Sequence, residues 1–258
     1  MLRSYHKCNK TQSYVVRSTD AGETWTSPAD GNLTNLFSGH TWQMLQFGEG
    51  MGLVLPDRIF TCGWIGSTLA ANQGSFGHAG VQCIKSMDNG KTWLLAGRLP
   101  SFPHVLEPEE PEIAVLKNGS VLLNMRDALK SHRRWEALSN DRGDTFSDPW
   151  ETDVIGPTSN AALVTLASGQ VVLANPRSTT SRVNLSLYTL NQDHVGKAEG
   201  EWEFVRTITE GGSAYVTSTR VANPASVGLL FETGSTSNPY ESINYLVVNC
   251  SQQKTRLA

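Results

Sequence analysis

The octapeptide STDAGETW at residues 18–25 recurs as SMDNGKTW at residues 86–93 and as SNDRGDTF at residues 139–146. All three copies keep Ser, Asp, Gly, Thr and an aromatic residue at the same places. Asp and Ser side chains can bond neighbouring backbone N–H groups and hold a turn, while Gly supplies a backbone angle φ above zero. The aromatic side chain can then insert into the core of the sheet. We interpret these boxes as structural turns and exclude their Asp residues as catalytic candidates.

A second repeat has the pattern Leu-x-x-Gly-x-Val-x-Leu and occurs at residues 116–123 and 166–173. Both copies lie on short apolar runs with turn residues beside them, which is typical of a strand–turn–strand hairpin. A repeating unit of about 50 residues that is built from hairpins predicts the blades of a β-propeller. Further strand-like runs occupy residues 58–64, 80–86, 135–139, 183–190, 203–208, 215–221, 227–232 and 242–248.

These runs predict an all-β protein with four blades and about half of a fifth. Residues 14–25 would form the second half of the first blade, and residues 203–208 and 215–221 would belong to two successive blades. No segment shows a helical period of convincing length.

Length and composition exclude several other classes. A chain of 258 residues can form one large β domain or at most two ordinary ones, and 39% hydrophobic residues suffice for a core. The longest apolar stretches are far too short to span a bilayer, so we expect no transmembrane segment. A net charge of −3 provides no excess of basic residues for nucleic acid. An anionic substrate would therefore depend on a few local arginines.

The four cysteines show neither CxxC spacing nor a neighbouring histidine cluster, so we expect no metal site and no cofactor. Cys62 and Cys83 lie in apolar segments, where we expect buried thiols. Acceptor sequons for N-glycosylation occur at Asn9, Asn32, Asn118, Asn184 and Asn249. Several of them are compatible with a protein of the secretory pathway, although Asn118 fits a hairpin turn better.

The boxes and the segments between them resemble the sialidase (neuraminidase) family, specifically its animal lysosomal and cytosolic members. The most specific element is residues 109–126, where Glu-Glu-Pro-Glu precedes Leu-x-x-Gly-Ser-Val and then Asn-Met-Arg. This element is similar to the family's Glu-bearing strand that ends in Asn-Ala-Arg. Residues 175–187 resemble an Arg-bearing strand of the lysosomal type. Residues 230–232 and 240–243 resemble the strand pair that carries the family's tyrosine.

The resemblance implies a six-bladed propeller, of which residues 1–258 would be one incomplete catalytic domain. It also implies a retaining exo-α-sialidase, which removes terminal sialic acid from glycoproteins, glycolipids or oligosaccharides. Sialylated glycoconjugates would then be the binding partners, while the sequence indicates no particular protein partner.

Two arginines are candidates for binding the substrate. Sialic acid carries a carboxylate on the carbon that undergoes substitution, and the family holds this group with three arginines. Planar guanidinium groups suit the task because they pair bidentately with a carboxylate and stay charged. By resemblance, Arg126 and Arg182 fall on two of the three positions. From the residues alone, Arg126 could equally be a solvated strand-end arginine that pairs with Asp127 or Glu136.

The family's nucleophile is a tyrosine, an exception among glycosidases. A phenol attacks as a neutral group, so the carboxylate of the substrate does not repel it. A tyrosine with the ordinary pKa of about 10 needs a base beside it. The resemblance implies that Tyr240 is the nucleophile, that Glu110 is its base, and that Tyr215 forms a wall of the pocket.

Other residues compete for these roles. Glu109 and Glu112 share the acidic run of Glu110, which could also be a solvated loop, but the 16-residue step to the site arginine favours Glu110. Trp64 and His78 lie in or near loops that could line the pocket, although a core Trp and a surface His are the simpler interpretation.

Two family elements have no counterpart in residues 1–14. They are the first arginine of the triad, in a Phe-Arg-Ile-Pro motif, and the acid/base aspartate that follows it. We therefore expect the chain to lack the N-terminal blade and the first half of the next. Loss of a general acid costs roughly 10²–10⁴-fold in rate, so we expect this chain alone to be weakly active or inactive.

Two other classes of function stay open. The chain could be a non-catalytic propeller that binds sialic acid or another glycan, or a structural propeller with a different ligand. The sequons and the lysosomal resemblance favour the lysosome or the secretory pathway over the cytoplasm. Residues 1–6 are polar from the third residue and predict no signal peptide.

Overall fold

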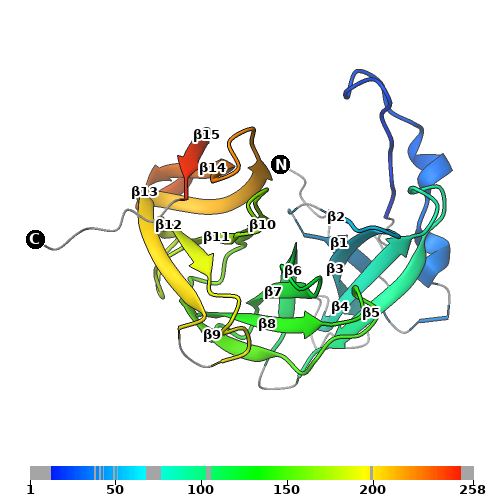
Figure 1. Ribbon diagram of the computed structural model, residues 1–258, viewed down its shortest axis with the longest axis horizontal. Coiled ribbons are helices and arrows are strands. Elements are labelled where there is room, and N and C mark those ends of the chain that lie inside the picture. The colour runs from blue at the N-terminus through cyan, green and yellow to red at the C-terminus, as the bar shows by residue number, and fades with distance from the viewer. Residues whose placement is uncertain are drawn as a thin grey trace, which may run out of the picture.

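Three antiparallel β-sheets follow one another around a common centre in the computed structural model (Figure 1). The structure describes residues 13–250 apart from 38, 41, 43, 49, 51, 68–76, 103–105, 198 and 199. The protein is therefore an all-β protein, as the sequence predicts. In this part of the chain the helices are two short 3-10 turns, η1 (Pro28–Gly31) and η2 (Thr34–Phe37), and neither could cross a membrane.

The first sheet has the strand order β1-β3-β4-β5, and β2 also pairs with β3. The strand bounds are β1 (Met44–Phe47), β2 (Leu53–Val54), β3 (Ile59–Ser67), β4 (Gly77–Ser86) and β5 (Leu94–Pro100). Cys62 and Cys83 face each other across β3 and β4 and form a disulfide. The expected burial of both residues is confirmed, but the expectation of free thiols is wrong, because the pairing register brings the two residues opposite each other.

The second sheet has four strands in sequential order. Their bounds are β6 (Pro108–Val115), β7 (Val121–Asp127), β8 (Arg133–Ser139) and β9 (Trp150–Ile155). Residues 116–120, from the second repeat, form the tight turn between β6 and β7, and Gly119 adopts a φ of 86° there. The hairpin predicted from the repeat is confirmed.

The third sheet joins six strands in sequential order. Their bounds are β10 (Ala162–Thr165), β11 (Val171–Pro176), β12 (Val183–Leu190), β13 (Trp202–Arg220), β14 (Ser226–Ser235) and β15 (Asn238–Asn249). The 19-residue β13 pairs with β12 along its first half and with β14 along its second half. The prediction of two separate strands at 203–208 and 215–221 is therefore wrong, because one continuous strand serves both neighbours.

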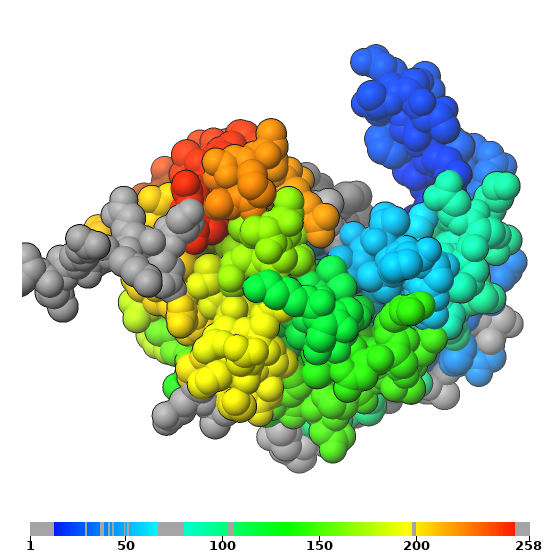
Figure 2. All heavy atoms as spheres, viewed as in Figure 1, coloured from blue at the N-terminus to red at the C-terminus, as the bar shows by residue number. Residues whose placement is uncertain are grey.

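Residues 14–25 also differ from the prediction. They contain no strand and pair only through an isolated bridge between Tyr14 and Asn32. This N-terminal arm, dark blue in Figure 2, projects at one end of the molecule. Tyr14 and Val16 are exposed in it, whereas Val15 packs against an apolar cluster of the first sheet.

All three Ser-Asp-Gly-Thr boxes have the same internal hydrogen bonds, which confirms that they are structural turns. In each box the Asp carboxylate accepts bonds from Ser, from the Thr hydroxyl and from the Thr backbone, and the Ser hydroxyl accepts one from the Gly backbone, at 2.5–3.0 Å. Trp93 and Phe146 pack against apolar clusters, as expected. Trp25 does not: its side chain is 60% exposed.

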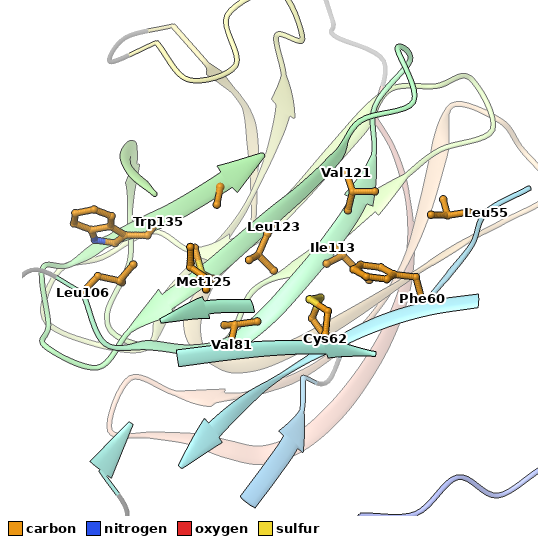
Figure 3. Packing of buried hydrophobic residues seen from close by; sticks show 13 residues of the cluster. Leu55, Phe60, Cys62, Val81, Leu106, Ile113, Val121, Leu123, Met125 and Trp135 are labelled. Atoms are coloured by element: carbon orange, nitrogen blue, oxygen red, sulfur yellow. A yellow bond between two sulfur atoms is a disulfide. The ribbon is translucent and has the colours of Figure 1, made fainter. Parts of the chain in front are cut away.

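Neighbouring sheets are held together by shared apolar clusters. One cluster joins the first and second sheets, where Phe60 and Val81 meet Ile113, Leu123 and other buried side chains (Figure 3). A second cluster joins the second and third sheets. Burial of this kind contributes roughly 25 cal/mol per Å² of apolar surface and fixes how the sheets lie relative to one another.

Candidate active site

Glu110 and Arg126 form the centre of a polar cluster. Glu110 lies in a β-bulge of β6, between the register positions of Glu109 and Glu112, with a φ of 41°. Arg126 lies on the neighbouring strand β7. Its Nη1 donates to Glu110 Oε1 at 2.8 Å, and its Nε lies 3.1 Å from Glu109 Oε2. Arg126 is therefore paired with these two glutamates and not with Asp127 or Glu136.

Tyr215 joins this pair from β13. Its hydroxyl donates a hydrogen bond to Glu110 Oε1 and lies 3.3 Å from Nη1 of Arg126. Its backbone N–H donates to Glu232 on β14 at 3.1 Å. The second and third sheets thus meet at the contact between a phenol and a carboxylate.

Arg182 approaches the same tyrosine from just before β12. Its guanidinium carbon lies 5.3 Å from the ring centroid of Tyr215, within cation–π range. Nη1 donates to the Tyr240 hydroxyl at 2.8 Å, and Nη2 donates to the Thr158 carbonyl at 3.2 Å. Tyr240 lies on β15, so three strands of one sheet supply these groups.

All five residues that the sequence singled out therefore lie in one connected cluster. Their arrangement differs from the expected one in a single respect. The hydroxyl that reaches Glu110 belongs to Tyr215, whereas the Tyr240 hydroxyl bonds Arg182. The cluster contains a phenol against a carboxylate with two guanidinium groups beside it, which can bind an anion and remove a proton from the phenol.

Unusual backbone conformations surround the cluster. Glu110, Thr158 and Asn184 are non-glycine residues with positive φ values of 41°, 54° and 59°. Glu110 and Asn184 coincide with register shifts in their strands. Bulges of this kind redirect side chains, and such strain concentrates at functional sites.

The pKa of the Arg126 guanidinium depends on its burial and on the two neighbouring glutamates. Burial by itself would lower the pKa of the Arg126 guanidinium, but the charge of Glu110 and its hydrogen bond raise that pKa above its usual range. Arg126 therefore stays charged and holds Glu110 as an acceptor for the Tyr215 proton.

A buried polar layer lies behind the cluster, and the sequence did not point to it. Arg134 donates to Asn124 at 2.8 Å and to the Ser159 carbonyl at 2.9 Å, and Asn124 donates to Glu136 at 2.7 Å. Burial lowers the pKa of Arg134 to about 10. The sequence feature that could have revealed this layer is the charged pair Arg134 and Glu136, which lies two residues apart beside the apolar Trp135 and Ala137.

The remaining candidates lie elsewhere or are not described. Glu112 is buried, whereas Trp64 is only half-buried and therefore does not fit the expectation of a core tryptophan. The side chain of His78 lies outside the described residues. A cavity of about 700 Å³ near Lys117 and Gln170 includes none of the five clustered residues. Within the described part of the chain, no group of three or more His, Cys, Asp or Glu could hold a metal.

Fold and cluster together define a class: an all-β protein built on Ser-Asp-Gly-Thr turns, with two arginines and two tyrosines gathered beside a glutamate. The chain belongs to the BNR repeat-like domain family, which matches residues 2–228. It is 24% identical over 243 residues to a sialidase of Bacteroides fragilis (strain YCH46) and 26% identical over 245 residues to a sialidase of Micromonospora viridifaciens. These alignments cover 90% and 88% of this chain, but only 41% and 34% of the relatives.

Solved structures show the same fold. A Hadza microbial sialidase superposes with a TM-score of 0.71 at 22% identity, covering 92% of this chain and 44% of that chain. A Trypanosoma rangeli sialidase in complex with sialic acid superposes with a TM-score of 0.65 at 17% identity, covering 97% and 41%. The sialidase resemblance is thus supported, and the two curated relatives are bacterial.

Proposed function

We propose that this chain carries the sialic-acid site of a retaining exo-α-sialidase, a glycoside hydrolase that removes terminal sialic acid from glycoproteins, glycolipids or oligosaccharides. The observation that carries the proposal is the Tyr215 hydroxyl against the Glu110 carboxylate, with Arg126 and Arg182 on either side. The similarity to two proteins named sialidases supports it.

In the proposed reaction, the substrate carboxylate pairs with Arg126 and Arg182. Glu110 takes the phenolic proton as the Tyr215 oxygen bonds to the anomeric carbon and the bond to the leaving-group oxygen breaks. Water then attacks the tyrosyl glycoside, the phenolate leaves, and the proton on Glu110 returns to it. The leaving-group oxygen needs a proton from a general acid in the first step, and the conjugate base of that acid takes the proton lost by water in the second. The five clustered residues do not fill this role.

This proposal exchanges the roles that the sequence predicted for the two tyrosines. A tyrosine of ordinary acidity needs a base within hydrogen-bond reach, and Tyr215 has one in Glu110. Tyr240 instead accepts a bond from Arg182, which stabilises the phenol oxygen without removing its proton. We therefore assign the nucleophile to Tyr215.

Three finer predictions belong to the same proposal. The succession of sheets in Figure 1 and the sialidase neighbours support an incomplete six-bladed propeller. The 16-residue step from Glu110 to Arg126 supports the animal lysosomal type. The Cys62–Cys83 disulfide supports folding in an oxidising compartment, such as the secretory pathway or the lysosome, over the cytoplasm.

A glycosyl fluoride of sialic acid with fluorine at C3 tests the nucleophile directly. Fluoride leaves without a general acid, and the second fluorine slows hydrolysis of the glycosyl-enzyme, so the label should stay on the protein. We expect peptide mass spectrometry to find the sugar on Tyr215. Tyr240→Phe should still be labelled, whereas Tyr215→Phe should not. A label on Tyr240 would return the nucleophile to that residue.

The alternative is a non-catalytic glycan-binding module, and the same experiment separates it from the enzyme. If the chain binds the unsaturated analogue 2-deoxy-2,3-didehydro-N-acetylneuraminic acid in calorimetry but is never labelled, the binding function stands and catalysis by this chain does not. If Arg126→Ala leaves the affinity for that analogue unchanged, both functions are wrong for this site.

A further inference from the structure

We propose that Tyr240 is a positioning residue that holds Arg182 in the orientation needed to bind the carboxylate of the substrate. The inference rests on the proposed function and gives Tyr240 a role that the reaction itself leaves open. The contacts of Arg182 differ in kind from those of Arg126.

Arg182 is held by neutral groups. Its donors reach the Tyr240 hydroxyl and the Thr158 carbonyl, and its planar face lies over the Tyr215 ring. Among the described ion pairs, Arg126 faces two carboxylates, while Arg182 takes part in none. Within the described part of the chain, no carboxylate neutralises the positive charge of Arg182, which is therefore available to an anionic ligand.

The number of donors agrees with this role. A guanidinium has five N–H groups, and two of them are used by Tyr240 and Thr158. Three remain, enough for a bidentate bond to a carboxylate. A carboxylate at position 240 would also hold Arg182, but it would neutralise the charge and compete with the substrate. A phenol fixes the geometry and leaves the charge free.

The backbone around Tyr240 is itself fixed against the strand that carries Tyr215. At Gly212 on β13, an added Cβ would lie 2.1 Å from the Ser235 carbonyl oxygen and 2.8 Å from Pro239 Cα, so the β14–β15 hairpin packs directly on that glycine. The next residue, Ser213, donates its N–H to the Arg182 carbonyl at 2.7 Å. The arginine, its phenol partner and the Tyr215 strand are thus held as one unit.

Tyr240 is nevertheless accessible, since its side chain is 55% exposed. Its hydroxyl can therefore be removed by substitution without leaving a cavity, and Tyr240→Phe changes one hydrogen bond. Tyr245 provides a matched control: it lies on the same strand and is 59% exposed, and its hydroxyl lies near Gly228 instead of the cluster.

The experiment measures calorimetric affinity of the 258-residue chain for 2-deoxy-2,3-didehydro-N-acetylneuraminic acid and for its methyl ester. We expect Tyr240→Phe to weaken binding of the free acid on the order of tenfold, the size of one hydrogen bond to a charged group, and to change binding of the ester less than about twofold. Tyr245→Phe should match the wild type for both ligands. Adding Tyr240→Phe to Arg182→Ala should cause no further loss.

Any other result of these binding measurements contradicts either the positioning role of Tyr240 or the proposed function. Unchanged affinity of Tyr240→Phe for the acid, or an equal loss for acid and ester, would overturn the positioning role while Arg182→Ala still weakens binding. A wild-type chain that binds neither ligand, or an Arg182→Ala variant with full affinity, would instead overturn the proposed function. Thermal midpoints of all four variants should agree with the wild type, which excludes a loss through unfolding.

Discussion

Two arginines of one cluster have opposite surroundings, and that difference decides what each can do. Arg126 is partly buried between Glu109 and Glu110, so its charge is balanced before any ligand arrives. Arg182 is held by uncharged oxygens. In the proposed reaction, Arg126 therefore holds the base as well as pairing with the substrate carboxylate, while Arg182 carries a positive charge that no described carboxylate balances.

A second residue-scale feature is the buried pair of Glu136 and Glu201. Glu136 accepts bonds from Asn124 at 2.7 Å and from Trp202 at 3.1 Å, and Glu201 accepts one from Trp150 at 3.0 Å. Burial, and then the charge of Glu201, raise the pKa of Glu136 well above its usual value. The hydrogen bonds from Asn124 and Trp202 oppose that shift only in part.

We expect this pair to make the protein less stable as the pH rises. A carboxyl group with a folded pKa above the unfolded value of 4.5 contributes full stability below pH 4.5 and loses it as the pH climbs through the folded pKa. Glu136→Gln should flatten this loss, because an amide donates to Glu201 without titrating. Urea unfolding midpoints at pH 4.5 and pH 7 measure the effect in the wild type and in the variant. An equal fall of the midpoint in both proteins would contradict the prediction.

At the scale of elements, the three boxes are alike internally but differ in what they contact. The box at residues 139–146 docks on the first sheet, where Asp144 pairs with Arg58 at 2.9 Å and with Lys85 at 2.5 Å. The box at residues 18–25 belongs to the exposed arm. The same turn therefore contacts a neighbouring sheet at residues 139–146, whereas at residues 18–25 it is a local turn of an exposed segment.

We expect Asp141→Ala to lower the free energy of unfolding by about 1–2 kcal/mol, since it removes the acceptor of the Thr145 N–H and hydroxyl. Asp20→Ala is the matched control and should cost clearly less. Burial would raise the pKa of Asp141, but bonds from Thr145 and Ser139 lower it to about 2. This stabilisation is complete above pH 4 and is lost as the pH falls through 2, which acid unfolding of both variants will measure.

The disulfide between β3 and β4 gives a second element-scale prediction. It closes a 21-residue segment, for which a cross-link stabilises by about 2–4 kcal/mol. Reductant should therefore lower the melting temperature of the wild type. The double variant Cys62→Ala with Cys83→Ala should melt lower and ignore reductant, although it keeps the buried free Cys250. A wild type that melts unchanged after its thiols are shown to be reduced would contradict the prediction.

At the scale of the whole molecule, the sheets are locked by close backbone approach as well as by apolar burial. The Gly143 carbonyl accepts a bond from the Gly97 N–H at 2.7 Å. A Cβ at Gly143 would lie 2.2 Å from Cζ of Phe60 in the first sheet. Two sheets thus touch where only glycine fits.

Gly143→Ala should therefore destabilise the protein far more than Gly119→Ala. Both glycines have a positive φ, of 90° and 86°, so both substitutions cost about 1–2 kcal/mol in backbone strain. Only Gly143 has a neighbour within reach of the new methyl group, which adds about 1–3 kcal/mol of overpacking. Chemical denaturation measures the difference, and equal losses would show that the sheets yield at this contact.

The last sheet exposes an apolar edge. Strand β15 ends its sheet, and large exposed side chains cover β14 and β15: Leu230, Tyr240, Ile243, Tyr245, Leu246 and Val247. Such an edge favours pairing with another chain, so we expect the isolated chain to associate as its concentration rises. Val247→Lys should reduce this association in light scattering while leaving the circular dichroism unchanged. Equal association of both proteins would place the contact elsewhere.

The amino-acid sequence determined the local structure of this protein and the set of candidate residues. Box chemistry and hairpin periodicity are local properties, so the turns at residues 86–93 and 116–120 followed from residue types alone. The family resemblance brought together Glu110, Arg126, Arg182 and both tyrosines, but it placed Tyr240 instead of Tyr215 beside Glu110.

The tertiary structure decided which groups touch. A bulge at Glu110, a 19-residue β13 and the packing of two sheets bring Tyr215 to the carboxylate and leave Tyr240 on the second arginine. The disulfide and the buried layer behind the site also depend on pairing between distant segments. Register and sheet packing are long-range properties, because the side chains of each strand contact residues of other strands. A local sequence pattern therefore does not predict which residues will be in contact.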